Sequence, residues 1–459
     1  MRFFQPRLGR PIRTSEPGLW PRPRRAAQRL LPAVTLLAVV CQILIAGPAQ
    51  AKSGDLDRSF GTRGIAAIDF NARTVAVQGK DKLIAAGTAF DGTTNVGTFT
   101  LARFTRDGAL DPTFGTGGTV STGFTGYQTA LLGALAVQAD GKLVAAGTVR
   151  SSSTGPFGDV ALARFKPDGT LDPTFGTGGT VTASFAGGPD DAQALVVQAD
   201  GKLVIAGFAN QDLNIDFGLA RFNPDGTLDP TFGTGGTVIT DFRGDPLGDR
   251  VSSLAVQADG KLVAAGTIGF RDKSVTEFAL ARYTADGTLD PTFGTDGKVI
   301  TAFHNPFGTS FDNVLHALVL QPDGKLVAAG TSRTVPYRLD FALARYNPDG
   351  TLDPTFGTGG EVTTDFGFDL GDDQAFALAL QPDGKLVATG RAVPENGAGI
   401  GLVRYNSDGT LDRSFGAAGK VTTAVASSGQ ALAIQPNGRL VVAGTVGGNA
   451  SSVLVRYRG

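Results

Sequence analysis

The chain has 459 residues, a formal net charge of −1 at pH 7 and a single cysteine, Cys41. Eight arginines and one glutamate lie in residues 1–51, a local charge of +7, so the rest of the chain carries −8. This acidic balance argues against nucleic acid or an anionic membrane as a partner of residues 52–459. Because that part of the chain has no cysteine, it also excludes disulfides, thiol nucleophiles and cysteine metal sites.

Residues 1–51 have the features of a signal peptide that is cleaved after Ala51. Arginines precede an apolar run from Leu30 to Ala46, and Ala49-Gln50-Ala51 supplies the small residues of a cleavage site. The apolar run also approaches the length of an uncleaved membrane anchor. Arg24-Arg25 offers a twin-arginine signal as a second alternative. We therefore expect an exported protein that is periplasmic, attached to the cell surface or secreted.

From Asp55 onward, one block of about 59 residues recurs seven times. The blocks are built around LDxxFGxxG, then QxDGKLVxAG, and then LxRY or LxRF, and the first block departs from the second motif with Gly79-Lys80-Asp81. The Phe-Gly dipeptides that mark its phase begin at Phe60, Phe114, Phe175, Phe232, Phe293, Phe356 and Phe415. Because the units of such an array bury their apolar faces against one another, we expect a single domain over residues 55–459.

Each block predicts four short strands. In one block, residues 237–242, 253–257, 261–266 and 278–283 are rich in β-branched and apolar residues and are bounded by Gly, Asp and Pro. An Asp-Gly pair such as Asp259-Gly260 joins the second and third strands and suits the positive φ of a tight hairpin.

A second constant turn follows the fourth strand, as in Asn223–Gly233, where Pro224 sets φ and Gly226 takes a special backbone angle. Phe232 in this turn is expected to fill the gap between adjacent sheets. Four antiparallel strands in each of seven blocks predict an all-β, seven-bladed β-propeller, which protects its sheet edges by radial repetition. An open β-solenoid is the alternative. In a propeller, the final strand at Val455–Tyr457 would meet the segment Asp55–Gly61 and close the ring.

Every block also contains an arginine on the fourth strand and an aspartate in the following turn. A sevenfold catalytic site is implausible, so we expect structural ion pairs. The arginines are Arg103, Arg164, Arg221, Arg282, Arg345, Arg404 and Arg456, and their partners, in the same order, are Asp111, Asp172, Asp229, Asp290, Asp353, Asp412 and Asp57.

The recurring motifs ALAxQxDGKLVAAGT, FALARYNPDGTLD and PTFGTGG closely resemble those of the delta-60 repeat proteins, a bacterial family of exported propeller-like chains. The resemblance covers residues 55–459. It implies a propeller architecture and an extracytoplasmic setting. It implies no catalytic residue, because that family has no agreed activity.

The connections between the first and second strands, and between the third and fourth, differ from block to block, and up-and-down topology places them on one face. Loops on a rigid scaffold commonly bind partners. We therefore expect a non-catalytic binding or scaffold propeller, monomeric, that presents this face to a cell-surface or extracellular protein or glycan. The candidate ligand-binding residues are Asp190, Asp191, Arg243, Asp245, Arg271, His304, Tyr337, Arg338, Asp372 and Asp373.

The rival hypothesis is a glycan hydrolase or lyase that uses loop carboxylates such as Asp190-Asp191 and Asp372-Asp373. It requires carboxylates from two blades within roughly 5–10 Å of each other at the mouth of the central channel. We expect no cofactor and no metal, since His304 and His316 are the only histidines and zinc would need more ligands. Calcium stays open at the Asn-Pro-Asp-Gly-Thr-Leu-Asp turns of residues 223–229 and 347–353, although no Glu closes either loop.

Overall fold

The computed structural model describes residues 52–459, with gaps at 95, 152–157, 212–213, 244–247, 271–274, 304–311, 336–337, 368–370, 396 and 448–450. The predicted signal peptide lies outside the described residues, so its presence and its cleavage stay predictions. Within the described ranges, no helix is long and apolar enough to cross a membrane.

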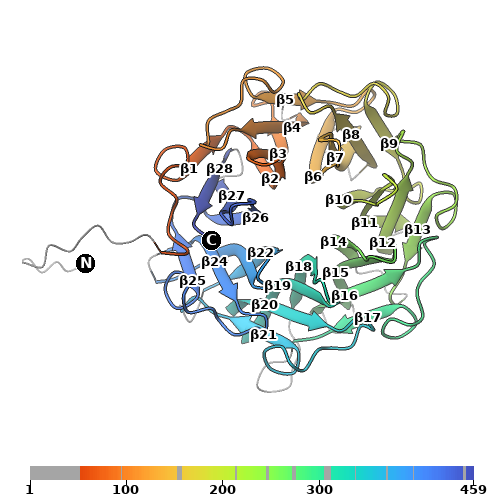
Figure 1. Cartoon of the computed structure of the whole chain (residues 1–459). Coiled ribbons are helices and arrows are strands. Elements are labelled where there is room, and N and C mark those ends of the chain that lie inside the picture. The colour runs from red at the N-terminus through yellow and green to blue at the C-terminus, as the bar shows by residue number, and fades with distance from the viewer. Residues whose placement is uncertain are drawn as a thin grey trace, which may run out of the picture. The chain divides into compact units, whose positions relative to one another are not determined.

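Seven four-stranded antiparallel sheets surround a common axis, as expected for a seven-bladed β-propeller (Figure 1). The innermost strands are β2 (Asn71–Gln78), β6 (Thr129–Val137), β10 (Asp191–Val197), β14 (Arg250–Val256), β18 (Asn313–Leu320), β22 (Gln374–Leu380) and β26 (Ser428–Ile434). The second strands are β3 (Lys82–Phe90), β7 (Leu143–Arg150), β11 (Leu203–Gln211), β15 (Leu262–Phe270), β19 (Leu326–Val335), β23 (Leu386–Ala392) and β27 (Leu440–Val446). The third strands are β4 (Gly97–Phe104), β8 (Asp159–Phe165), β12 (Asn214–Phe222), β16 (Val275–Tyr283), β20 (Arg338–Tyr346), β24 (Gly399–Tyr405) and β28 (Ser451–Tyr457). The outermost strands are β5 (Thr119–Thr122), β9 (Thr180–Ala183), β13 (Thr237–Thr240), β17 (Lys298–Thr301), β21 (Glu361–Thr364), β25 (Lys420–Thr423) and β1 (Ile65–Ile68).

The ring closes in the seventh blade, as predicted. The N-terminal strand β1 pairs with the C-terminal strand β28, in the register Ile65↔Val455 to Ile68↔Ser452. The amide of Gly54 extends this contact by donating to the carbonyl of Arg458 at 2.8 Å. The open solenoid is therefore wrong for this chain, because in the described residues both ends of the array pair with each other.

The middle strands are longer than the sequence predicted. The expected strands 261–266 and 278–283 become β15 and β16, whose pairing runs on to Phe270↔Val275. Extended backbone pairs there without needing an apolar side chain at every position, so propensity alone ended these strands too early.

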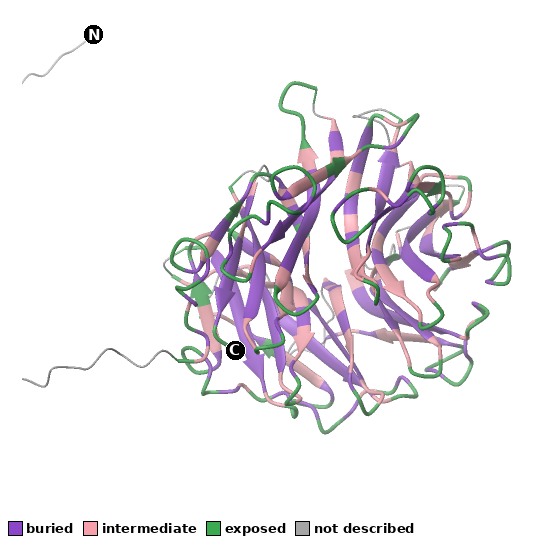
Figure 2. Cartoon of the chain, turned by 45° about the horizontal axis from the view of Figure 1, so that its top comes forward, coloured by how far each residue is buried: buried purple, intermediate pink, exposed green. Residues whose placement is uncertain are grey.

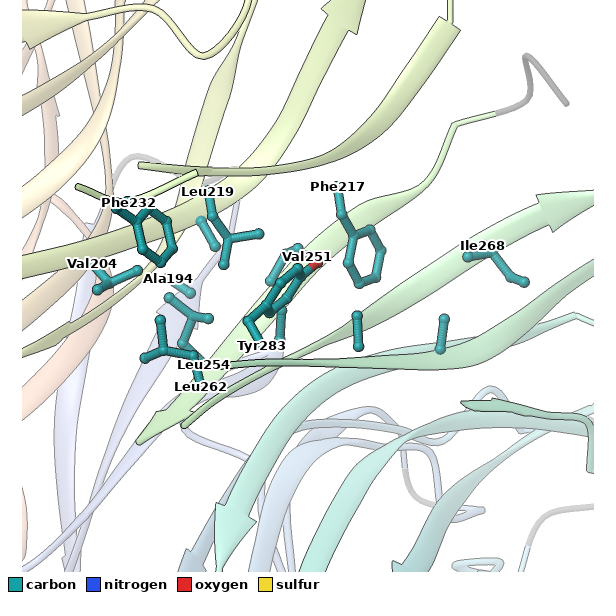
Figure 3. Close-up of a cluster of buried hydrophobic side chains, with 14 residues drawn as sticks. Ala194, Val204, Phe217, Leu219, Phe232, Val251, Leu254, Leu262, Ile268 and Tyr283 are labelled. Atoms are coloured by element: carbon teal, nitrogen blue, oxygen red, sulfur yellow. The ribbon is translucent and has the colours of Figure 1, made fainter. Parts of the chain in front are cut away.

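The apolar core lies between neighbouring sheets. Figure 3 shows one cluster in which Phe232 and Leu219 face Leu254 and Tyr283 from the next blade. Phe232 is fully buried, as are its six counterparts, which confirms the predicted contact between blades. Burying one such ring contributes about 1.5–3 kcal/mol relative to leaving it exposed. Figure 2 shows the result, with buried strands and exposed connections at both ends of the blades.

Candidate binding face and channel mouth

The strand order gives the propeller two different faces. We call constant face the side formed by hairpins such as 257–261 and by the turns from third to outermost strands, such as 223–236. We call variable face the opposite side, whose described residues are 69–70, 91–94, 96, 123–128, 151, 158, 184–190, 241–243, 248–249, 302–303, 312, 365–367, 371–373, 393–395, 397–398, 424–427 and 447. The complete turns from third to outermost strands share one length, whereas the variable-face connections differ in length and composition.

The constant face is held by the seven predicted Arg–Asp contacts. In the second blade, Arg164 Nε lies 2.9 Å from Asp172 Oδ2, and the guanidinium stacks 4.6 Å from the centre of the Phe175 ring. The same arginine donates to the backbone carbonyl of Pro224 in the next blade. Equivalent pairs occur in the other blades, including Arg456 with Asp57 across the closure at 2.9 Å. These arginines therefore join turn, strand and neighbouring blade.

The aspartate of each pair is stabilised as an anion. Burial would raise the pKa of Asp172, but hydrogen bonds from Thr174 and the charge of Arg164 outweigh it and lower the pKa to about 2. Lys142 adds a second cation at 3.4 Å. This buried charge is compensated, so it serves stability.

The turns that resemble calcium loops are also internally satisfied. Asp225 Oδ1 accepts hydrogen bonds from the amide and hydroxyl of Thr227, at 2.9 and 2.7 Å. Asp229 pairs with Arg221 and Lys202 at 2.7 and 2.8 Å. These oxygens are used by the turn itself, so the turn explanation suffices for the motif.

Each innermost strand carries one β-bulge, and the seven bulged residues meet on the axis. Register shifts separate Ala72 from Thr74 in β2 and occur at the equivalent place in the other six strands. The residues set out of register are Arg73, Gly133, Gln193, Ser252, His316, Phe376 and Gln430, which we call the bulge ring. The same seven residues line a cavity of about 240 Å³.

The bulge ring is polar, aromatic and asymmetric. The Arg73 guanidinium donates to Gln193 Oε1 at 3.4 Å, and the rings of His316 and Phe376 meet edge to face at 5.1 Å. Burial lowers the pKa of His316 to about 4, with a further contribution from Arg73, so the imidazole is neutral at pH 7. Arg73 thus supplies the ring's single formal charge at pH 7.

A second cavity, of about 200 Å³, adjoins the ring and is lined by residues of the first three blades. Arg73 and Gln193 line it together with Asp191, Phe90 and Asn71. Gln193 Nε2 donates to Asp191 Oδ2 at 2.6 Å, so the polar groups of the ring continue onto the variable face.

Three of the predicted candidate residues are buried and hydrogen-bonded within the protein. Asp190 accepts from the Ser184 hydroxyl at 2.6 Å, and burial raises its pKa. Asp191 accepts from the Thr148 hydroxyl. Asp373, which is 1% exposed, accepts from the amide of Val393 at 2.7 Å. These carboxylates therefore form hydrogen bonds inside the protein that hold the conformation of the variable-face connections.

Arg338 and Asp372 lie close to Asp373, because Leu339 forms a β-bridge with Asp372 and the Leu339 carbonyl accepts from the Asp373 amide at 2.8 Å. Arg338 forms ion pairs with Asp340 and Asp365, and Asp372 is half-buried with its carbonyl near Arg391 at 3.4 Å. Arg243 is exposed in the β13–β14 connection. Asp245, Arg271, His304 and Tyr337 lie outside the described residues.

The sequence analysis missed the bulge ring. In an alignment of the seven blocks, this column reads Arg, Gly, Gln, Ser, His, Phe and Gln, between columns of mostly small or aliphatic residues. That contrast was the available signal. None of the seven residues lining the cavity carries a carboxylate, so the ring lacks the acid pair that the hydrolase or lyase hypothesis requires.

The fold and the repeated motifs together define a β-propeller repeat protein. The family described as "Domain of unknown function (DUF5122) beta-propeller" matches residues 81–114, 138–175, 198–232, 257–293, 321–356, 381–415 and 435–458, one segment in each blade. The chain belongs to this family. A comparison with curated proteins found no match.

Several solved structures are similar to the chain. One is the polysaccharide lyase Uly1, at 13% identity and a TM-score of 0.48, covering 89% of this chain and 97% of that one. PorZ, a surface component of the type-IX secretion system of Porphyromonas gingivalis, has 12% identity and a TM-score of 0.43, covering 90% and 48%. Sqt1 of Chaetomium thermophilum, bound to the N-terminus of ribosomal protein L10, has 12% identity and a TM-score of 0.46, covering 86% and 99%.

Proposed function

We propose that this chain is an exported, non-catalytic binding propeller of the delta-60 repeat group. It presents the variable face, with the bulge ring at its centre, to a protein or glycan at the cell surface or outside the cell. The observation that carries the proposal is the bulge ring itself. At structural positions, such as those of the Arg–Asp pairs, the same residue type recurs in every blade, whereas the residue type at this axial position differs in nearly every blade.

The chemistry of the ring supports binding. Ligand sites are concave and combine apolar or aromatic surface with a few placed polar groups. Here the edge-to-face pair of His316 and Phe376 supplies the aromatic surface, while Gln193 and Gln430 supply amides and Arg73 a cation. Such a set can pack against a sugar ring or a side chain and hydrogen-bond its polar atoms.

A binding screen tests the proposal. Purified wild-type protein is applied to a glycan array and a protein array, and each hit is titrated by calorimetry. A triple variant, Arg73→Ala, His316→Ala and Phe376→Ala, should lose the hit, because it removes the charge and the aromatic pair. Lys80→Ala, an exposed change in a hairpin of the constant face, is the matched control and should bind as wild type does.

Circular dichroism must show that the triple variant keeps its strands. Equal binding by wild type and triple variant would contradict a role for the ring. A wild-type protein that binds no probe on either array would contradict the proposed partner classes.

A further inference from the structure

A group of three carboxylates on the variable face lies outside the bulge ring. Asp216 belongs to the start of β12, and Asp241 and Asp249 belong to the connection between β13 and β14. Each offers one oxygen, and these oxygens lie within 4.8 Å of one another. The β12–β13 register creates the cluster, because Phe217 pairs with Thr240 and so places their neighbours Asp216 and Asp241 at the same end of the sheet.

Asp216 is the unusual member. Its side chain is only 6% exposed, yet among the described residues no hydrogen-bond donor and no cation contacts it. Burying a carboxylate without a partner is strongly unfavourable. Burial and the charge of Asp241 both raise its pKa, so the protein itself does not compensate this charge.

Two cations near the cluster, Lys298 and Arg250, contact other groups. Lys298 donates to the backbone carbonyl of Asp241 at 2.6 Å and lies 5.5 Å from the centre of the Phe242 ring. Arg250 stacks over Phe208 at 4.7 Å. Asp249 accepts a hydrogen bond from the Phe242 amide at 3.2 Å. Two buried carboxylates and one exposed carboxylate thus converge here.

A second group of three aspartates at equivalent positions shows how an arginine can offset the negative charge of such a cluster. Asp340, Asp365 and Asp373 occupy the equivalent positions two blades further on, with oxygens again within 4.8 Å. There Arg338 reaches Asp340 at 3.2 Å and Asp365 at 3.6 Å. Asn214 holds the position of Arg338 in β12, two residues before Asp216. Arg338 therefore contacts two members of one cluster, and the other cluster has the amide of Asn214 at that position.

We propose that Asp216, Asp241 and Asp249 bind a hard divalent cation, with Ca²⁺ as the first candidate. Carboxylate oxygens are the ligands that Ca²⁺ prefers, at about 2.3–2.6 Å, and two oxygens on opposite sides of one ion then lie about 4.6–5.2 Å apart. The exposure of Asp241 leaves access for the ion and for the water ligands that complete its shell. This site is separate from the bulge ring, so it stands independently of the proposed function.

Calorimetric titration of chelator-treated protein with Ca²⁺, Mg²⁺ and Mn²⁺ tests the site, together with the shift of the melting temperature on adding each ion. Wild type should bind one ion per chain and melt at a higher temperature with the ion. Asp216→Asn should lose both responses and should fold, because it removes a buried charge. Asp340→Asn, in the arginine-neutralised cluster, is the control and should keep both responses.

A reciprocal exchange sharpens the test. Asn214→Arg should replace the ion with a side-chain cation and abolish binding, whereas Arg338→Asn should create a second site and raise the stoichiometry from one ion to two. The proposal is overturned if none of the three ions binds wild type saturably. It is equally overturned if Asp216→Asn binds as wild type does.

Discussion

The two faces of the propeller shift the pKa values of buried aspartates in opposite directions. On the constant face, Asp172 and its counterparts pair with an arginine, and their pKa values lie below the usual range. On the variable face, burial raises the pKa values of Asp190, Asp216 and Asp373. Arginine-paired carboxylates therefore lie where the blocks agree, while these carboxylates with raised pKa values lie where the blocks differ. That separation lets one face change without loss of the fold.

The strongest test of this division removes a constant-face aromatic. Phe232→Ala should lower the free energy of unfolding by about 3–5 kcal/mol, because it leaves a cavity between two blades and removes the ring under Arg221. Urea denaturation followed by circular dichroism measures it. Phe90 is 45% exposed and lies beside the variable face, so Phe90→Ala should change the free energy of unfolding by no more than about 0.5 kcal/mol. Equal losses would contradict the comparison.

A second test uses the charge pairs. Asp172→Asn should cost about 2 kcal/mol at pH 7, because Arg164 loses its anionic acceptor. The folded-state pKa of Asp172 is about 2 against an ordinary 3.8, so this stabilisation is complete above pH 4 and is lost as the pH falls toward 2.

Urea titrations between pH 7 and pH 2 should therefore show that the difference in free energy of unfolding between wild type and Asp172→Asn becomes smaller as the pH falls. A difference in free energy of unfolding that stays constant over this range would show that the ion pair is not the cause of that difference.

A third, smaller effect concerns the outer edge of the blades. Tyr283 donates to Thr240 Oγ1 at 2.8 Å, and both side chains are buried. Tyr283→Phe should lower the free energy of unfolding by about 1 kcal/mol, because the Thr240 hydroxyl loses its partner. The preceding blade offers a natural control, since Phe222 stands at the equivalent position and Ala183 replaces the threonine. Ala183→Thr should therefore not stabilise the protein unless Phe222→Tyr accompanies it.

The smallest expected effect on stability is at the bulge ring. Arg73→Ala should change the free energy of unfolding by no more than about 0.5 kcal/mol, because the side chain is exposed and its contact to Gln193 is long. The same change should weaken binding of any ligand found in the screen. A loss of stability as large as that of Phe232→Ala would instead assign the ring a structural role.

The features that recur in every block could be predicted from the sequence. Gly226 adopts a φ of 92°, as its turn requires, and an added Cβ would lie 2.8 Å from Val181 Cγ2 of the neighbouring blade. Phe232 and the Arg–Asp pairs were found in the same way, since repetition reveals a structural demand. Ring closure followed from the order of the motifs at the two ends.

The features that differ between blocks were harder to predict. A β-bulge adds one residue to one strand at a place that strand propensity does not mark, so the sequence analysis did not single out Arg73 or Phe376. The Asp216 cluster joins residues that are distant in sequence: the β12–β13 register brings Asp216 and Asp241 together, and the Asp249 amide reaches the carbonyl of Ile215 at 2.7 Å. Asp190 and Asp373 were chosen because they lie in acidic loops, a pattern that does not distinguish inward from outward side chains.

Closure by β1 and β28 also orders the events of folding. Strand β1 cannot take its place in a sheet until β28 has been made, and the contact between Ala72 and Ser452 spans 380 residues. Six blades can assemble while the seventh waits for both of its ends. A chain interrupted during translation would keep an unpaired sheet edge, which is the kind of surface that chaperones and proteases recognise.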